Sequence, residues 1–117
     1  MRPLQSSYSL GAKVVEFRNV REEDFLPIIR VIDDWWGGRH MADMLPRLFF
    51  VHFQDTSFVV TDGGRIVGFL VGFVSQTHPS QAYIHFVGIH PDYRKQGLGN
   101  YIAAEYFEAP GSGHEQR

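Results

Sequence analysis

A basic loop that contains two glycines joins an apolar stretch to a helix-like pattern in "VGIHPDYRKQGLGNYIAAEYF", residues 87–107. Arg94 and Lys95 supply positive charge, and Gly97 and Gly99 lack the β-carbons that would keep an anion away from the backbone. The first turn of a helix exposes N–H groups without internal partners, and the helix dipole favours negative charge there. The stretch therefore predicts a phosphate or pyrophosphate site, unless the glycines only serve a tight turn and the basic side chains are solvated.

Other phosphate-binding motifs fit this loop less well. The dinucleotide fingerprint needs a third small residue three positions after the second glycine, where this chain has Ile102. It also needs an acidic residue about twenty positions later, and the given sequence ends before such a position. The Gly-Lys-Ser/Thr sequence of a P-loop is absent as well.

The loop resembles the acetyl-coenzyme A signature of the GNAT superfamily of N-acetyltransferases. The core of that signature, Arg/Gln-x-x-Gly-x-Gly/Ala, falls on Arg94, Gly97 and Gly99. The hydrophobic-x-hydrophobic-x-Pro pattern that precedes it falls on "VGIHP", residues 87–91. The order of elements and the opening "VVEFRNVREEDFLPII" also resemble this family, so the resemblance covers roughly residues 14–107.

The resemblance implies acetyl-CoA as cosubstrate and direct attack by a primary amine in a ternary complex. Backbone N–H groups of residues 94–100 would hold the pyrophosphate, and the backbone of Val87 and Ile89 would pair with the pantetheine arm as another strand does. An N–H in this strand would stabilise the oxyanion. The implied cofactor-binding residues are Val87, Gly88, Ile89, Arg94, Lys95, Gln96, Gly97, Leu98, Gly99 and Asn100.

An amine acceptor must lose a proton before or during the attack. With a pKa near 10.4, a lysine-like amine needs about 4–5 kcal/mol to become neutral at pH 7, so a general base helps. Many relatives carry an acidic residue early on this strand, but here "AYIHF" has none. Simple alternation places Tyr83 and His85 on the same strand face as Val87 and Ile89. His85 is the first catalytic candidate and Tyr83 the second; the alternative is that both only pack in the sheet.

The segment "DDWWGGRHMAD" is the candidate acceptor site, because in this family the link between the first two helices commonly lines the acceptor pocket. Asp33 and Asp34 could hold a cationic amine, and Trp35 and Trp36 could form an aromatic wall. The alternative is a helix C-terminus whose two aromatic residues fill the core. The histidines lack the paired spacing of metal ligands, so no metal is expected.

Hydrophobic periodicity gives the element order β-α-α-β-β-β-α. The resemblance implies that these elements form an α/β fold with a GNAT-like mixed, largely antiparallel sheet and flanking helices. The predicted elements are a strand over 13–20, a helix over 21–36, a helix over 41–53 bent or started at Pro46, a hairpin turning at Asp62-Gly63-Gly64, a strand over 81–90 and a helix over 97–108. Residues 1–12 are expected to be an irregular lead-in, 13–108 a partial GNAT-like domain, and 109–117 a polar tail.

The family fold normally continues with another strand, a helix and two closing strands. "APGSGHEQR", residues 109–117, cannot encode these elements, which predicts a C-terminally truncated domain. The alternative function is then an acyl-CoA-binding or vestigial module that is catalytically incomplete. The apolar strand "YIHFVGI" would also expose an edge that can pair with another chain, so a homodimer is expected.

Composition narrows the remaining function classes. The chain has 117 residues, a formal net charge of −2 and no cysteine. The charge argues against nucleic-acid binding, and the absence of thiols rules out disulfides and a cysteine nucleophile. No run approaches the ~18–20 apolar residues of a membrane span, so neither a membrane partner nor a membrane location is expected. The expected setting is the cytoplasm, with a small-molecule or peptide amine as acceptor.

Overall fold

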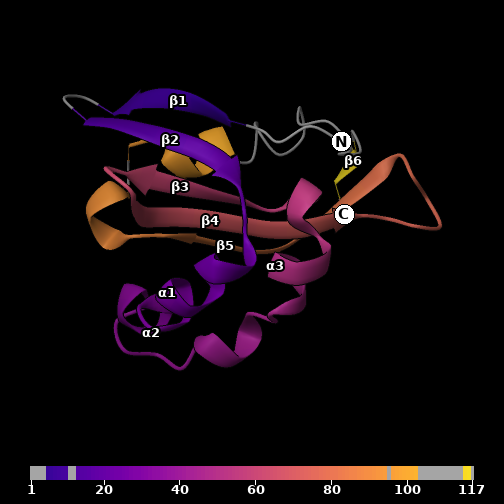
Figure 1. The fold of residues 1–117 in the computed structure, drawn as a ribbon, viewed down its shortest axis with the longest axis horizontal. Coiled ribbons are helices and arrows are strands. Elements are labelled where there is room, and N and C mark those ends of the chain that lie inside the picture. Colours follow the sequence, from indigo (N-terminus) through magenta and orange to yellow (C-terminus); the bar gives the residue numbers. More distant parts are fainter. Residues whose placement is uncertain (1–4, 11–12, 95, 103–114, 117) are drawn as a thin grey trace.

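Six strands form one sheet in the order β1-β2-β3-β4-β5-β6 (Figure 1). The computed structural model describes residues 5–10, 13–94, 96–102 and 115–116. The strands are β1 Gln5–Leu10, β2 Lys13–Asn19, β3 Phe58–Asp62, β4 Arg65–Val74, β5 Gln81–Ile89 and β6 Glu115–Gln116. Neighbouring strands are antiparallel except for β5 and β6, which are parallel. The predicted mixed, largely antiparallel sheet is confirmed.

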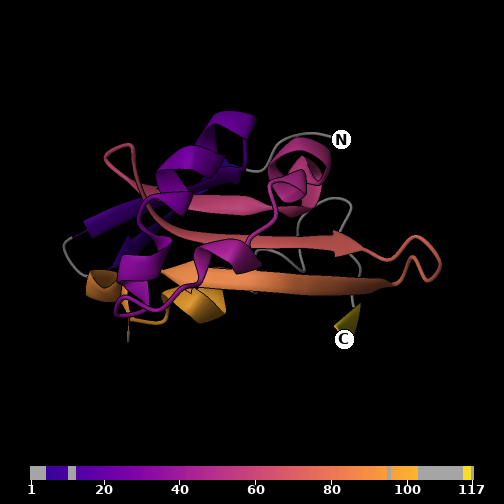
Figure 2. The ribbon, with the colours of Figure 1, turned by 90° about the horizontal axis from the view of Figure 1, so that it is seen from below.

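Three short helices lie together on one face of this sheet (Figures 1 and 2). They are α1 Phe25–Ile29, α2 Ile32–Trp35 and α3 Leu48–His52, with 3₁₀ turns at Glu22–Asp24, Ala42–Met44, Gln54–Thr56 and Pro91–Tyr93. The predicted helix over 21–36 is interrupted because Val31 N–H bonds to the carbonyl of Ile28, three residues back. The predicted helix over 41–53 begins only at Leu48. Leu45 precedes Pro46 and is extended, as a residue before proline prefers to be.

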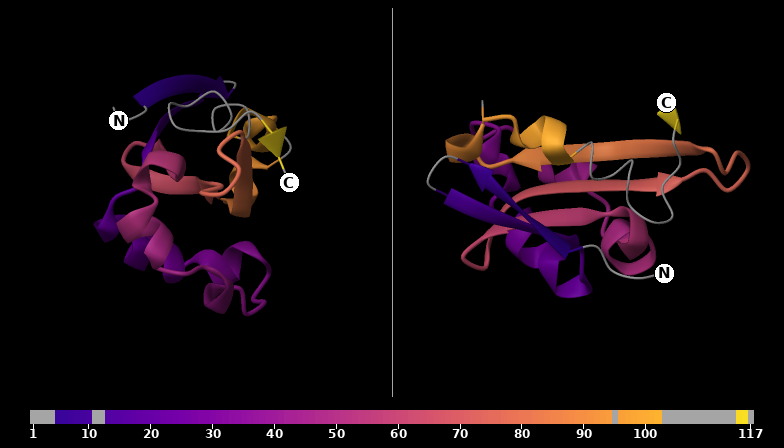
Figure 3. Two further views of the ribbon diagram at one scale, coloured as in Figure 1. Left: turned by 90° about the vertical axis from the view of Figure 1, so that its right-hand side faces the viewer. Right: turned by 90° about the horizontal axis from the view of Figure 1, so that it is seen from above.

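The sheet separates two apolar clusters. On the α1–α3 face, Ile28, Ile32 and Phe50 pack against Phe69 and Val71 of β4. On the other face, residues 98–102 are helical and place Leu98 and Ile102 against β2, β3 and β4 (Figure 3, right panel). The remaining residues of the predicted helix over 97–108 lie outside the described part of the chain.

Both ends of the described chain add strands that the sequence did not predict. Residues 5–10, expected to be irregular, form β1 against β2. The ring of Tyr8 on β1 stacks on Tyr101 with centroids 4.0 Å apart, so β1 packs on the helix at 98–102. Within the expected polar tail, Glu115–Gln116 pairs with Gln81 and Ala82 of β5. Only Tyr8 and Leu10 of β1 are apolar, and two residues are too few to give the alternation that predicts a strand.

The hairpin between β3 and β4 is confirmed. Asp62 pairs with Arg65, which leaves Gly63 and Gly64 as a two-residue loop. Their φ angles are 57° and 86°, the left-handed region that tight hairpin turns require at both positions.

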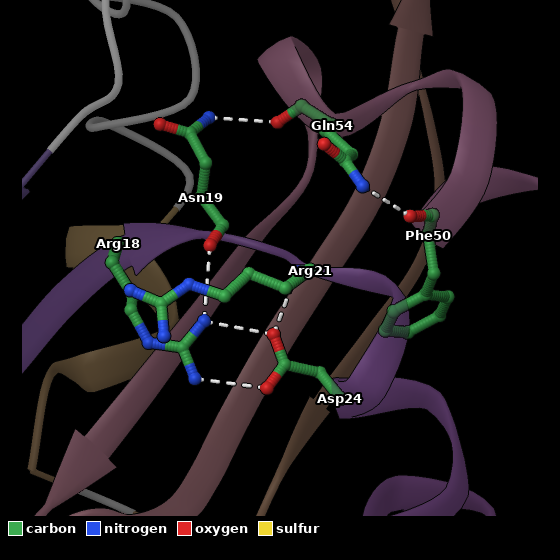
Figure 4. A network of polar contacts seen from close by, with 6 residues as sticks. All are labelled: Arg18, Asn19, Arg21, Asp24, Phe50 and Gln54. Atoms are coloured by element: carbon green, nitrogen blue, oxygen red, sulfur yellow. Dashed lines mark hydrogen bonds and ion pairs between the residues drawn. The ribbon is translucent and has the colours of Figure 1, made fainter.

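An ion pair joins β2 to the helical layer (Figure 4). Arg18 donates two hydrogen bonds, of 2.8 and 2.9 Å, to the buried carboxylate of Asp24. The backbone N–H of Arg21 donates a third, of 2.7 Å. The contact with Asp24 raises the pKa of Arg18. Asn19 and Gln54 extend the network to the end of α3, so the helical layer is fixed on the sheet that carries the candidate site.

Candidate active site

The backbone of β5 faces β4 on one side. On its other side β6 pairs with Gln81 and Ala82, and no described strand pairs with residues 87–89, which we call the open edge. His90 N–H donates to the carbonyl of Val67 across the ladder at 2.8 Å. Because hydrogen-bonded residues alternate along an antiparallel strand, Phe86 and Gly88 also direct their backbone groups toward β4. Val87 and Ile89 therefore direct theirs away from β4. The guanidinium Nε of Arg94 donates to the Ile89 carbonyl at 3.0 Å, which agrees with this direction.

A β-bulge interrupts β5 at His85. Val71 pairs with Phe86 and Gly72 with Ile84, so His85 is the extra residue in β5. The bulge shifts the alternation by one residue, and the expectation that Tyr83 and His85 share a face with Val87 and Ile89 is wrong. His85 and Phe86 pack with the apolar cluster on the sheet face that α1, α2 and α3 cover, whereas Val87 and Ile89 pack on the opposite face.

The environment of His85 determines which ring nitrogen can accept a proton. Its Nε2 lies 3.1 Å from the carbonyl oxygen of Met44, and its ring stacks on Phe49 at 5.1 Å. A carbonyl only accepts hydrogen bonds, so Nε2 carries the hydrogen and Nδ1 is the acceptor of the neutral ring. Tyr83 lies 6.0 Å from His85 between ring centroids and also contacts Phe73, so the two catalytic candidates are neighbours.

Two glycines shape the loop that follows β5. Gly97 has φ +80°, which other residues rarely adopt. A β-carbon on Gly99 would lie 3.2 Å from Ile89 Cδ1, so this glycine lets the helix approach the end of β5. Tyr101 N–H donates to the Gly97 carbonyl at 3.1 Å, while Leu98 is buried and Asn100 is exposed. The loop thus brings small residues and a helix start to the open edge of β5, an arrangement that fits a pyrophosphate.

The side chain of Arg94 braces this loop and does not point freely to solvent. Besides Ile89, it donates to the carbonyl oxygen of Trp35 at the end of α2, and it lies over the ring of Trp36 at 5.7 Å. Its backbone N–H bonds to Pro91, and Gln96 bonds through its side chain to the Asp92 carbonyl. Arg94 therefore connects the loop to the helical layer. Lys95 lies outside the described residues.

A tyrosine anchors the start of the loop to the β3–β4 hairpin. The hydroxyl of the buried Tyr93 donates to Asp62, and this hydrogen bond, with burial, raises the tyrosine pKa. Lys13 Nζ lies 4.2 Å from the centre of the Tyr93 ring. These contacts fix the turn that precedes the glycines.

Gly88 is packed against aromatic rings. A β-carbon there would lie 2.5 and 2.8 Å from Phe69 and 3.1 Å from Trp36. The Trp36 ring also contacts Phe86, at 5.2 Å between centroids. Trp36 of the predicted acceptor segment thus packs against β5.

The other three predicted acceptor residues, Asp33, Asp34 and Trp35, have separate surroundings. Asp33 Oδ1 accepts the N–H groups of Met41 and Ala42, at 2.8 and 2.9 Å, and so begins the next turn of the chain. Trp35 is buried in the core, as the alternative interpretation expected. Asp34 borders a separate hollow together with Arg65 and His90. The structure does not bring the two carboxylates together with His85.

Two general features of the described residues bear on function. They contain no group of three or more His, Asp or Glu side chains arranged to hold a metal ion. None of their helices combines the length and apolar character that crossing a bilayer requires.

The sequence contained a signal for some features of the candidate site and none for others. The outward-facing groups of Val87 and Ile89, the helix start and its glycines follow from the motif. The bulge at His85 and the contact of Arg94 with Trp35 had no signal in the sequence, since both depend on segments distant in the chain.

The chain is similar to acetyltransferases in sequence and fold. The family model described as "Acetyltransferase (GNAT) family" matches residues 16–110. An L-2,4-diaminobutyric acid acetyltransferase of Virgibacillus pantothenticus is 36% identical over 50 residues, which are 43% of this chain and 31% of that protein.

Two solved structures show the same fold. Diaminobutyrate acetyltransferase from Paenibacillus lautus, in complex with L-2,4-diaminobutyric acid and coenzyme A, has a TM-score of 0.70 at 20% identity, over 86% of this chain and 60% of that one. A GNAT acetyltransferase from Brucella melitensis in complex with acetyl-CoA has a TM-score of 0.58 at 15% identity, over 78% and 64%. The chain spans less than two thirds of each of these relatives. The match over residues 16–110 shows that the chain belongs to the GNAT acetyltransferase family.

Proposed function

We propose that this chain is an N-acetyltransferase that moves an acetyl group from acetyl-CoA to a primary amine by direct attack. The observation that carries the proposal is the meeting of two features. The open edge of β5, at Val87 and Ile89, ends at the glycine loop around Gly97 and Gly99. Family membership supports acetyl-CoA as the donor.

The edge of β5 offers a defined set of backbone groups for the pantetheine arm. Arg94 already uses the Ile89 carbonyl, so the groups that no described residue is seen to bond here are the N–H and carbonyl of Val87 and the N–H of Ile89. An arm lying along this edge would pair as an added strand does. The start of the helix at Leu98 would then receive the pyrophosphate.

Bound acetyl-CoA would supply a thioester carbonyl, at which the amine nitrogen would form the new C–N bond. The C–S bond would then break, and coenzyme A would leave as a thiolate. Within the chain, Nδ1 of His85 accepts the proton that the amine loses. Met44 keeps the opposite nitrogen protonated and Phe49 fixes the ring plane. A backbone N–H at the open edge stabilises the negative charge on the carbonyl oxygen.

The test is release of coenzyme A in the presence of amines, with the His85→Ala variant. We expect kcat to fall about 10²-fold or more, as for loss of a general base, with acetyl-CoA affinity within a few-fold of the parent. His78→Ala, in the exposed link between β4 and β5, is the matched control and should keep full activity. An unchanged rate in folded His85→Ala removes the base assignment. Binding of acetyl-CoA without release for any amine would favour the acyl-CoA-binding module instead.

A further inference from the structure

An apolar hollow of ≈ 490 Å³ lies beside His85, between α3 and the strands β4 and β5. Its walls include Leu48, Phe49, Phe53, Phe73, Gln76 and His85, and we call it the aromatic groove. The volume is within the range of small-molecule sites, about 300–1,000 Å³. His85 belongs both to this groove and to the proposed reaction centre, so the two are continuous.

None of the described residues that line the groove is an acidic residue, a lysine or an arginine. Its polar side chains are Gln76 and His85, and the rings of Phe49, Phe53 and Phe73 contact one another or His85. Asp33 is engaged by backbone N–H groups, and Asp34 borders the separate hollow at His90. A second charge on a ligand would therefore lose water in this groove without gaining a partner, whereas an apolar group would gain contact.

We infer, on the basis of the proposed function, that the acceptor is a primary amine carrying an aryl or branched alkyl group. That group lies on Phe49, Phe53 and Phe73, and the amine nitrogen lies toward His85. This acceptor class differs from the diaminobutyrate of the Paenibacillus lautus complex, which carries additional charged groups. The aromatic groove thus sets specificity for this chain.

The test compares phenethylamine, n-butylamine and L-2,4-diaminobutyrate by two readouts. One is kcat/KM from coenzyme A release, and the other is amine affinity by calorimetry with coenzyme A present. We expect phenethylamine to exceed both others by about 10-fold or more in each readout, since apolar pockets discriminate on this scale.

A matched pair of leucine variants tests whether the preference for phenethylamine arises in the aromatic groove. Leu48→Gln changes the lip of the groove, and Leu26→Gln changes α1 outside it; the two leucines are 45% and 56% exposed, so both proteins should fold. Leu48→Gln should reduce the phenethylamine preference about threefold or more through lost apolar contact, and Leu26→Gln should leave it unchanged.

The outcomes separate this inference from the proposed function. If no amine releases coenzyme A, the proposed function fails, but tight phenethylamine binding that weakens in Leu48→Gln still supports the groove. Equal binding of phenethylamine and butylamine, or a preference for diaminobutyrate, overturns the inference even if the enzyme is active. A parent dimer that Leu48→Gln converts to monomers also overturns it, because the groove would then be an interface.

Discussion

Replacing Gly88 by alanine should destabilise the protein, because its β-carbon would enter space that the Phe69 ring occupies. Relief of a 2.5 Å contact to an ordinary carbon distance requires a shift of about 1 Å. Phe69 is fully buried, and the rings of Trp35 and Phe86 lie 6.2 and 5.5 Å from it, so it has little room to move. Overpacking of this kind costs about 1–3 kcal/mol.

Gly68 provides the matched control on the neighbouring strand. A β-carbon there would meet its nearest atoms at 3.4 and 3.5 Å, which is ordinary contact. Gly68→Ala should therefore be neutral or stabilising by about 0.4–1 kcal/mol through the unfolded state. The two variants should differ by roughly 2 kcal/mol in their free energy of unfolding.

Urea unfolding followed by tryptophan fluorescence measures this difference. With a slope of about 1–3 kcal/mol per M, the two midpoints should lie about 1 M apart. In a double-mutant cycle, Phe69→Leu should partly compensate Gly88→Ala, giving a total loss smaller than the sum of the single losses. Equal midpoints for Gly88→Ala and Gly68→Ala would refute the packing argument.

Three further predictions concern the fold and assembly. Asp24→Asn should lower the free energy of unfolding by about 3 kcal/mol, the lower end for a broken buried pair, because 20% of the Arg18 side chain is exposed. Asp34 is exposed, so Asp34→Asn should change the free energy of unfolding little. Similar losses in the two variants would contradict the role of the Arg18–Asp24 pair. The hydrogen bond from Tyr93 to Asp62 raises the pKa of Tyr93, so it stabilises the fold fully below about pH 10, the pKa of an unfolded tyrosine. This stabilisation is lost as the pH rises through the pKa of the folded protein. Urea midpoints at pH 9 and 11 should therefore fall more in the parent than in Tyr93→Phe, and parallel falls would exclude this role. The expected homodimer should scatter light as twice 13.4 kDa at low micromolar concentration, whereas the mass of one chain would reject it.

The sequence predicted those parts of the fold and site that local chemistry determines. The two glycines of the β3–β4 turn and the proline before α3 act through their own backbone, so the hairpin and the late start of α3 follow from residue type. The bulge at His85 arises from pairing with β4, and one extra residue reverses every side chain beyond it. The use of Asp33 as an acceptor for Met41 and Ala42 depends likewise on how the chain folds back after α2.

Calorimetric titration of acetyl-CoA into the parent, Gly97→Glu and Gly38→Glu tests the central claim most directly. Both glycines have positive φ, +80° and +87°, so both variants carry the same added charge and similar backbone strain. The account predicts one site per chain in the parent and in Gly38→Glu, and loss of binding by about 10-fold or more in Gly97→Glu, where the carboxylate meets the pyrophosphate position. Binding by Gly97→Glu as tight as by the parent, or no binding by the folded parent, would contradict it.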